Sequence, residues 1–265
     1  MKLGGAAGDL LAGRRGLILG VSHRRSVGFV CASRFSEWGA CLALSSRGHL
    51  GSAGPALAKE LGALSLTIDA EQESTFEEGL RTVEKELGGL DFLVHTMVGA
   101  PADALRRSVV ELTQSEFGQA MDVGVRSLLV ALRYSAPLLR CSPAPRVIVL
   151  TSSGADFAIP GYHLVGMVKA ALNAAVRYAA ADLGRDGVLC NALCFSMVPT
   201  ETACRVIGEE VTERTVSHLA RRSMTGTAVG LDEVASVAAF LVSEACRGIT
   251  GQVITVDNGF SRSYF

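Results

Sequence analysis

The sequence predicts a single α/β domain built on a doubly wound parallel sheet of about seven strands, with helices on both faces. Seven short apolar runs recur along the chain, and most are hydrophobic at nearly every position, which is typical of strands covered on both sides. Segments of helical length and spacing separate these runs, so strand and helix alternate as in a series of right-handed crossovers. A chain of 265 residues suits one domain of this kind.

The apolar runs define the expected strands, at residues 16–20, 41–44, 64–68, 92–95, 147–150, 188–193 and 252–256. The clearest expected helices are residues 26–39, 71–87, 115–139 and 232–243. Residues 199–230 are the least patterned stretch, and we interpret them either as a segment that covers a substrate or as a solvent-exposed helical excursion. Ligands of such folds bind at the carboxyl ends of the strands.

Composition and charge exclude several classes of protein. Twenty-five Lys and Arg against 26 Asp and Glu leave a net charge of −1, with no basic excess to hold a nucleic acid. The longest stretch without a charged residue, 187–200, is shorter than the roughly 18 apolar residues that span a bilayer, and the first residues lack a secretory signal pattern. The seven cysteines show no metal-binding spacing. We therefore expect a cytoplasmic protein with reduced thiols and with no metal, membrane or nucleic-acid partner.

The turn after the first strand is of the kind that approaches a dinucleotide. It reads Gly20-Val-Ser-His-Arg-Arg-Ser26. A tight turn at Gly20 would let the backbone reach a pyrophosphate, while Ser26 would cap a helix whose free N–H groups face the anion. The strict G-x-G-x-x-G pattern is absent, so a turn without a ligand is the competing interpretation. With a ligand, the sheet would be of the Rossmann type.

The second strand leads to Arg47, where an NAD enzyme would usually place an acid for the ribose 2′-hydroxyl. Arg47, with Arg24 or Arg25 from the first turn, would pair with a 2′-phosphate and favour NADPH over NADH. The alternative is that these are ordinary surface arginines. Asp69 follows the third strand, where it would bring a carboxylate near the adenine, form a turn or cap a helix.

Tyr162 and Lys169 form the most informative pair in the chain. Seven residues return a helix to nearly the same face but about 10 Å along its axis, so both groups reach one ligand most easily if Tyr162 precedes the first turn. An ammonium group beside the phenol would lower the pKa of the phenol. The competing interpretation is an ordinary boundary Tyr and an exposed helix Lys.

The surroundings of this pair carry a family resemblance. The supporting segments are Gly20 with Ser26 six residues on, Asp69-Ala70, Leu90-Asp-Phe-Leu-Val-His95, Ala158-Ile-Pro-Gly-Tyr162, Cys190-Asn-Ala and Gly251-Gln-Val-Ile-Thr-Val-Asp257. From about Gly13 onward the sequence resembles the short-chain dehydrogenase/reductase superfamily, and within it the bacterial enoyl-acyl-carrier-protein reductases. The seven-residue Tyr-to-Lys step is specific, because most of the superfamily places the Lys four residues after the Tyr.

The resemblance implies an NADPH-dependent (or NADH-dependent) oxidoreductase, a homotetramer, and an acyl thioester substrate that an acyl carrier protein could carry. It makes Tyr162 the hydrogen-bond donor to the thioester carbonyl and Lys169 the anchor of the nicotinamide ribose. Positions that match cofactor contacts of the family are Gly20, Ser26, Val27, Arg47, Asp69, Ala70, Met97, Val198 and Thr200, to which the first turn adds Arg25. Ala100 matches a substrate contact.

Three departures from the family pattern keep other hypotheses open. Many members carry a second Tyr where this chain has Ser152, and ketoreductases of the superfamily place a carbonyl-binding Ser there. The usual Ser-Ala-Gly-Pro segment is Cys194-Phe-Ser-Met197, and Asn258 replaces a Gly. The first hypothesis is an NADPH-dependent enoyl-thioester reductase. The second is a ketoreductase or alcohol dehydrogenase that uses Ser152, Tyr162 and Lys169, and the third is a catalytically silent nucleotide-binding homologue.

Overall fold

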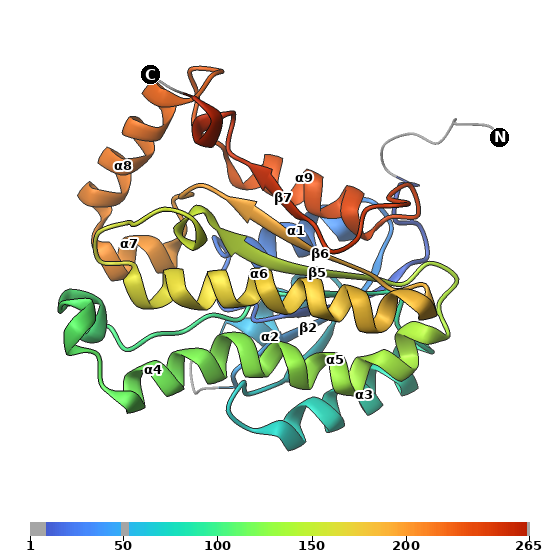
Figure 1. The fold of residues 1–265 in the computed structure, drawn as a ribbon. Coiled ribbons are helices and arrows are strands. Elements are labelled where there is room, and N and C mark those ends of the chain that lie inside the picture. Colours follow the sequence, from blue (N-terminus) through green and yellow to red (C-terminus); the bar gives the residue numbers. More distant parts are fainter. Residues whose placement is uncertain (1–8, 49–52, 264–265) are drawn as a thin grey trace.

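The fold is a three-layer α/β sandwich around one sheet of seven parallel strands (Figure 1). The computed structural model describes residues 9–48 and 53–263. The strand order is β3-β2-β1-β4-β5-β6-β7. The strands are β1 (Arg15–Leu19), β2 (Cys41–Ser46), β3 (Leu64–Thr67), β4 (Phe92–His95), β5 (Arg146–Ser152), β6 (Leu189–Phe195) and β7 (Val253–Val256). The predicted fold class is confirmed, and each predicted strand has a counterpart.

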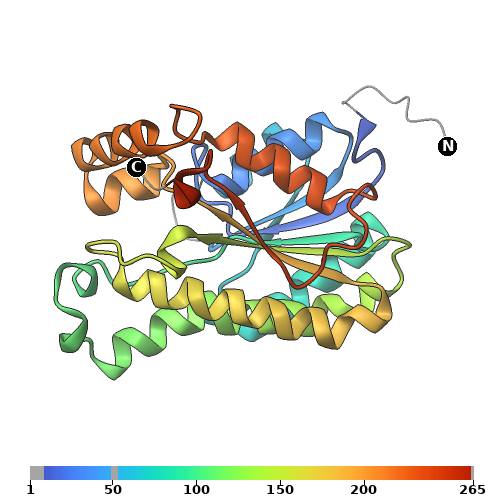
Figure 2. The ribbon, with the colours of Figure 1, turned by 45° about the horizontal axis from the view of Figure 1, so that its top comes forward.

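Helices cover both faces of the sheet, as Figure 2 shows with the sheet between two helical layers. The helices are α1 (Val27–Glu37), α2 (Gly54–Glu60), α3 (Glu73–Leu87), α4 (Gln114–Met121), α5 (Ser127–Arg140), α6 (His163–Leu183), α7 (Glu201–Ile207), α8 (Glu209–Arg222) and α9 (Leu231–Val242). One layer contains α1, α2 and α9, and the other contains α3, α5 and α6. The short helices α7 and α8 lie at the end of the sheet where β5 and β6 finish (Figure 1).

The predicted helix at 115–139 is interrupted. It divides into α4 and α5, which a π-helical turn at Asp122–Arg126 joins. This turn packs tightly on α6, because a Cβ on Gly124 would lie 2.3 Å from the Val168 side chain. Such single π-turns are rare and tend to occur near functional sites. No local feature of the sequence indicates this turn, since the apolar spacing continues through it.

Two apolar clusters, one on each face, hold the layers together. Phe92 of β4 is fully buried and packs edge-on against Phe35 of α1, with 5.6 Å between ring centroids. Its ring also lies over Gly16 of β1, where a Cβ would come within 2.0 Å of the ring carbons. Truncation of a buried Phe to Ala typically costs about 3–5 kcal/mol, so this packing is a main source of stability.

Among the helices that the structure describes, none is both long and apolar enough to cross a bilayer. The described residues also contain no group of three or more His, Cys, Asp or Glu that could hold a metal ion. All seven cysteines lie in the described part of the chain and are free thiols.

Candidate functional site

Six neighbouring strands deliver the predicted site residues to one edge of the sheet. All strands are parallel, so their carboxyl ends meet at the same edge. The candidates lie at or just after these ends, with Gly20 after β1, Arg47 after β2, Asp69 and Ala70 after β3, Met97 and Ala100 after β4, Ser152 in β5, and Val198 and Thr200 after β6. The topology therefore brings together residues that are up to 180 positions apart in the chain (20 to 200).

The turn at Gly20 has the shape that was predicted. Gly20 has a φ of +90°, and a Cβ there would lie 2.8 Å from Thr96 Oγ1 and 3.3 Å from the Met97 backbone N. Ser26 caps α1, since its Oγ accepts a hydrogen bond of 3.2 Å from the Phe29 N–H. This close backbone approach, beside a capped helix N-terminus with Val27 as its first residue, fits the pyrophosphate of a dinucleotide.

The three arginines near this turn are all engaged within the chain. Arg47 forms ion pairs with Asp69 and, at very short range, with Glu71. Arg24 binds the Glu60 carboxylate with two guanidinium nitrogens, and Arg25 Nη2 donates to the Pro199 carbonyl over 2.9 Å. A 2′-phosphate at Arg47 would therefore have to compete with two carboxylates.

Asp69 forms the turn that was one of its predicted roles. Its carboxylate accepts the Glu71 N–H over 3.1 Å, whereas Gln72 is the N-cap of α3. The neighbouring Ala70 is buried, and its carbonyl accepts Arg126 Nη2 over 3.0 Å.

The remaining cofactor candidates have structural contacts of their own. Met97 and Val198 are buried at 8% and 4% exposure. The Thr200 hydroxyl caps α7 by accepting the Ala203 N–H over 3.1 Å. Ala100 is half-buried and packs against the apolar cluster on the α6 side of the sheet. These residues follow the carboxyl ends of β4 and β6, at the same edge of the sheet as the turn at Gly20.

Tyr162 and Ser152 meet at the carboxyl end of β5. Tyr162 is the N-cap residue of α6, just before the first turn, as the spacing to Lys169 required. Its hydroxyl lies 3.1 Å from Ser152 Oγ, and either oxygen can donate. Lys169 lies about two turns further along α6 and is 6% exposed. Its Nζ donates to the Leu150 carbonyl of β5 over 2.8 Å. The structure thus places the three predicted catalytic side chains around the carboxyl end of one strand, β5.

The electrostatics of these groups differ from the prediction in one respect. We expected Lys169 to lower the pKa of Tyr162, but burial raises the pKa of this phenol and outweighs the opposing hydrogen bond from Ser152. That expectation is wrong, because the ammonium is directed at the Leu150 carbonyl. Burial also lowers the pKa of Lys169 to about 8.

His95, in β4, is a neutral neighbour of Lys169. Burial, and secondarily the charge of Lys169, lowers the pKa of His95 to about 3. Its Nε2 lies 2.8 Å from Ser127 Oγ, and this hydroxyl also donates to the Val123 carbonyl over 2.6 Å. His95 is therefore held as an uncharged core residue and does not act as an acid at neutral pH.

Two glycines that the sequence analysis did not single out position the Tyr162 ring. A Cβ on Gly154 would lie 2.5 Å from both Cδ1 and Cε1 of Tyr162, and a Cβ on Gly166 would lie 2.6 Å from the Gly154 carbonyl oxygen. The loop after β5 thus presses directly on α6. Tyr162 also borders an open hollow of about 330 Å³, which Phe157, Ile159 and Met167 line as well.

Comparison with known proteins identifies the family. The family model described as "Enoyl-(Acyl carrier protein) reductase" matches residues 20–261. The chain belongs to the enoyl-(acyl carrier protein) reductase family. The predicted class, an NAD(P)H-dependent oxidoreductase of the short-chain dehydrogenase/reductase type, is confirmed at this level.

Relatives match the chain over almost its whole length. The enoyl-[acyl-carrier-protein] reductase [NADH] of Aquifex aeolicus is 31% identical over 253 residues, which are 95% of this chain and 92% of that protein. The Bacillus cereus enoyl-acyl carrier protein reductase, solved with NADP+ and indole naphthyridinone, has a TM-score of 0.90 at 26% identity and covers 97% of this chain and 100% of that one. The Anaplasma phagocytophilum reductase, solved with NAD, has a TM-score of 0.88 at 27% identity, with 97% of each chain covered.

The departure from the family pattern at Asn258 has a structural explanation. Asn258 has a φ of +53°, a conformation that glycine adopts most easily and that Asn tolerates better than other residues. Its Nδ2 donates to the carbonyl and hydroxyl oxygens of Thr227, each over 3.2 Å, and its own carbonyl accepts the Met224 N–H over 3.0 Å. Asn258 therefore ties the end of the 199–230 segment to the C-terminal turn.

The start of this segment contacts the turn that follows β1. His23 Nε2 lies 2.9 Å from Thr202 Oγ1, and His23 Nδ1 lies 3.3 Å from the Glu201 carboxylate. These contacts join residues about 180 positions apart, so no local pattern in the sequence could reveal them. They connect the proposed cofactor turn directly to α7, the first helix of the 199–230 segment.

Proposed function

We propose that this protein is an NADPH-dependent enoyl-thioester reductase in which Tyr162 stabilises the enolate of a trans-2-enoyl thioester. The observation that carries the proposal is the 3.1 Å contact between the hydroxyls of Tyr162 and Ser152 at the carboxyl end of β5. The buried Lys169 binds the carbonyl of Leu150, two residues before Ser152 in the same strand. This cluster shares its edge of the sheet with the Gly20 turn, which fits a dinucleotide. Membership of the enoyl reductase family supports the same reaction.

The side chains suggest how the reaction would proceed. When bound, the nicotinamide supplies a hydride for the β-carbon of the enoyl group. Negative charge then builds on the thioester oxygen, and the Tyr162 hydroxyl donates a hydrogen bond to it, while Ser152 assists through its contact with that hydroxyl. Because burial raises the pKa of Tyr162, the phenol keeps its proton at neutral pH and remains a donor. Removal of one such donor typically costs about 3 kcal/mol of transition-state stabilisation. Protonation of the α-carbon completes the reduction.

Lys169 would hold the nicotinamide ribose. Its ammonium already donates to the Leu150 carbonyl, which fixes its position at the end of β5 and leaves further N–H groups for a ribose hydroxyl. The segment at 199–230 would cover the acyl chain. Its first helix is tied to the cofactor turn through His23, and its far end is tied to the C-terminal turn through Asn258.

Cofactor choice rests on Arg47. The names of relatives specify NADH, whereas the Bacillus cereus reductase was solved with NADP+. Arg47 follows β2, from where it would pair with a 2′-phosphate, although Asp69 and Glu71 compete for it. We expect Arg47→Ala to raise KM for NADPH about tenfold and to leave KM for NADH unchanged, with Arg81→Ala on α3 as the control. Equal KM values of the wild type for both cofactors, unaffected by Arg47→Ala, would remove the NADPH preference from the proposal.

The reaction is tested by following NADPH absorbance with crotonyl and acetoacetyl thioesters in parallel. Oxidation with the crotonyl thioester supports enoyl reduction. Oxidation with the acetoacetyl thioester alone would favour the second candidate, a ketoreductase with Ser152, Tyr162 and Lys169, for which the Ser152–Tyr162 contact is the specific support. Tight NADPH binding without turnover of either thioester would favour the silent homologue.

The carrier and the assembly remain part of this proposal. The curated relatives are named for acyl-carrier-protein substrates, and we extend that carrier to this chain. The homotetramer and the cytoplasmic location predicted from the sequence also stay predictions. Light scattering coupled to size-exclusion chromatography tests the first of these, with a mass of four 27.7 kDa chains expected.

A further inference from the structure

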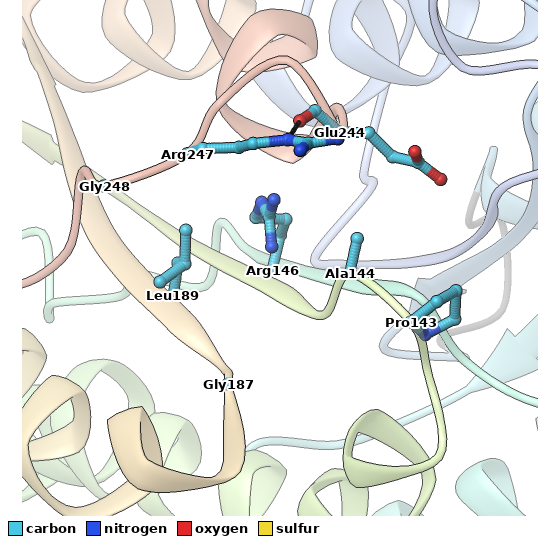
Figure 3. A pocket seen from close by; sticks show the side chains of 8 residues that line it. All are labelled: Pro143, Ala144, Arg146, Gly187, Leu189, Glu244, Arg247 and Gly248. Atoms are coloured by element: carbon cyan, nitrogen blue, oxygen red, sulfur yellow. Dashed lines mark hydrogen bonds between the residues drawn. The ribbon is translucent and has the colours of Figure 1, made fainter.

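A second pocket opens at the opposite edge of the sheet (Figure 3). Its volume is about 360 Å³, and it lies between the first residues of β5 and β6, Arg146 and Leu189, and the loop that follows α9. Arg146 and Ser152 are the two ends of β5, so the strand rise of about 3.3 Å per residue separates this pocket from the catalytic cluster by about 20 Å. The two sites share no residue.

Arg146 is a buried cation without an anionic partner. Its side chain is 4% exposed, its Nη1 donates only to the Pro145 carbonyl over 2.9 Å, and its Nε is buried without a hydrogen-bond partner. Among the described residues, no carboxylate forms an ion pair with it. A buried guanidinium that lacks an anion is unfavourable, because burial removes the water that would otherwise solvate the charge. The pocket therefore contains a donor group that its own chain does not satisfy.

Two further arginines increase the positive charge around this pocket. Arg247 lies across the opening with its Nε donating to the Glu244 carbonyl over 3.1 Å, and Figure 3 shows Arg146 pointing from below toward both residues. Arg14, 6% exposed, donates to the Ala144 carbonyl over 2.6 Å and lies 3.7 Å from the Glu244 carboxylate. The nearby Asp91 is engaged by Arg15 through two nitrogens. Among the residues that line this pocket, Glu244 is the one carboxylate.

We propose that this pocket binds the phosphate group of a small ligand, with Arg146 and Arg247 as its guanidinium donors. The planar fork of Arg matches the oxygens of a phosphate, and charge-assisted hydrogen bonds of this kind are the strong ones. The volume is at the lower end of the roughly 300–1,000 Å³ of small-molecule sites, which suits free phosphate or a small phosphate monoester. Gly187 and Gly248 border the pocket, and a Cβ at either would meet no atom within 4 Å.

Negative charge at the rim of the pocket partly offsets the charge of the arginines. Glu244 lies at the rim, with its side chain 59% exposed, and helix α9 ends at Val242 just before it, so both supply some negative charge. An incoming phosphate would compete with the Glu244 carboxylate for the arginines. Glu244→Gln is therefore expected to tighten phosphate binding several-fold. If the arginines served only to pair with Glu244, neither the wild type nor Glu244→Gln would bind phosphate.

The experiment is calorimetric titration of the full chain with inorganic phosphate and, separately, with glycerol 3-phosphate, at constant ionic strength, in the absence and in the presence of saturating NADPH. We expect one saturable site per chain for at least one of the two ligands, and the tighter of them identifies free phosphate or a monoester as the source. Arg247→Gln should weaken binding at least about tenfold. Arg81→Gln, which removes an exposed arginine on α3, should leave binding unchanged.

Several results would overturn the proposal. These are the absence of saturable binding for both ligands, equal affinity in Arg247→Gln and the wild type, and loss of the binding when NADPH is added, which would locate the phosphate in the cofactor crevice. Arg146→Gln provides a second variant, used only if its circular dichroism and thermal unfolding match the wild type. Because Arg247 is remote from Tyr162, the kcat of Arg247→Gln with the crotonyl thioester should not change, so failure of this proposal and failure of the reductase proposal are distinguishable.

Discussion

Replacement of Gly154 by Ala tests whether the position of the Tyr162 ring controls the reaction. The added Cβ would lie 2.5 Å from two ring carbons, whereas unstrained carbon contacts are about 3.5–4.0 Å. The ring must therefore move by about 1 Å, which also disturbs the 3.1 Å contact with Ser152. A misplacement of about 1 Å at a reacting group typically lowers the rate about 100-fold.

The assay is steady-state reduction of a crotonyl thioester by NADPH. We expect Gly154→Ala to lower kcat about 100-fold and to leave the dissociation constant of NADPH within twofold, because the residue lies away from the Gly20 turn. Gly118→Ala on α4 is the matched control, since a Cβ there meets no atom within 4 Å. A kcat of Gly154→Ala equal to that of the control, in a protein that unfolds at the same temperature, would refute this reasoning.

Three further predictions concern charge and hydrogen bonding. Burial lowers the pKa of Lys169 from 10.5 to about 8, so the unfolded chain binds more protons than the folded chain between these pH values. The stability of the wild type relative to Lys169→Met should therefore rise by about 3 kcal/mol from pH 7 to 10.5. Urea unfolding measures this difference, and a difference independent of pH would contradict the prediction. Burial opposes ionisation of Asp91, yet hydrogen bonds from Arg15 lower its pKa from 3.8 to about 2. The wild type should therefore be more stable than Asp91→Asn by about 2 kcal/mol above pH 4, and this advantage should disappear as the pH falls through 2. Acid titration should show it, with Asp91→Asn unfolding at a higher pH than the wild type. Ser152→Ala should lower kcat about three- to tenfold through loss of its bond to Tyr162, and Ser152→Thr should restore most of it; full activity of Ser152→Ala would remove Ser152 from the mechanism.

Much of the fold follows from local patterns in the sequence. Most of the strands are nearly continuous apolar runs, as burial on both faces favours, although the edge strands β3 and β7 are only partly buried. Each strand begins and ends within a few residues of its predicted place. The position of Tyr162 before the first turn of α6 also followed from its spacing to Lys169. The short helix α2 was not singled out, since its seven residues are too few for a periodic pattern.

The site required information that only the three-dimensional arrangement contains. The pairing of Arg47 with Asp69 and Glu71 joins residues from two strand ends, and its effect on a 2′-phosphate could not be seen from Arg47 alone. The raised pKa of Tyr162 depends on how deeply the phenol is buried, which the residue pattern does not specify. The close contact of Gly154 with the ring likewise arises where a loop and a helix meet.

The role of Tyr162 is measured most directly by the single-turnover rate of Tyr162→Phe with NADPH and a crotonyl thioester. This substitution removes one hydroxyl and keeps the ring that packs on Gly154. We expect the rate of hydride transfer to fall about 100- to 1,000-fold, as for the loss of an oxyanion donor, while NADPH binds with unchanged affinity. A rate within twofold of the wild type would show that the phenol does not stabilise the developing charge.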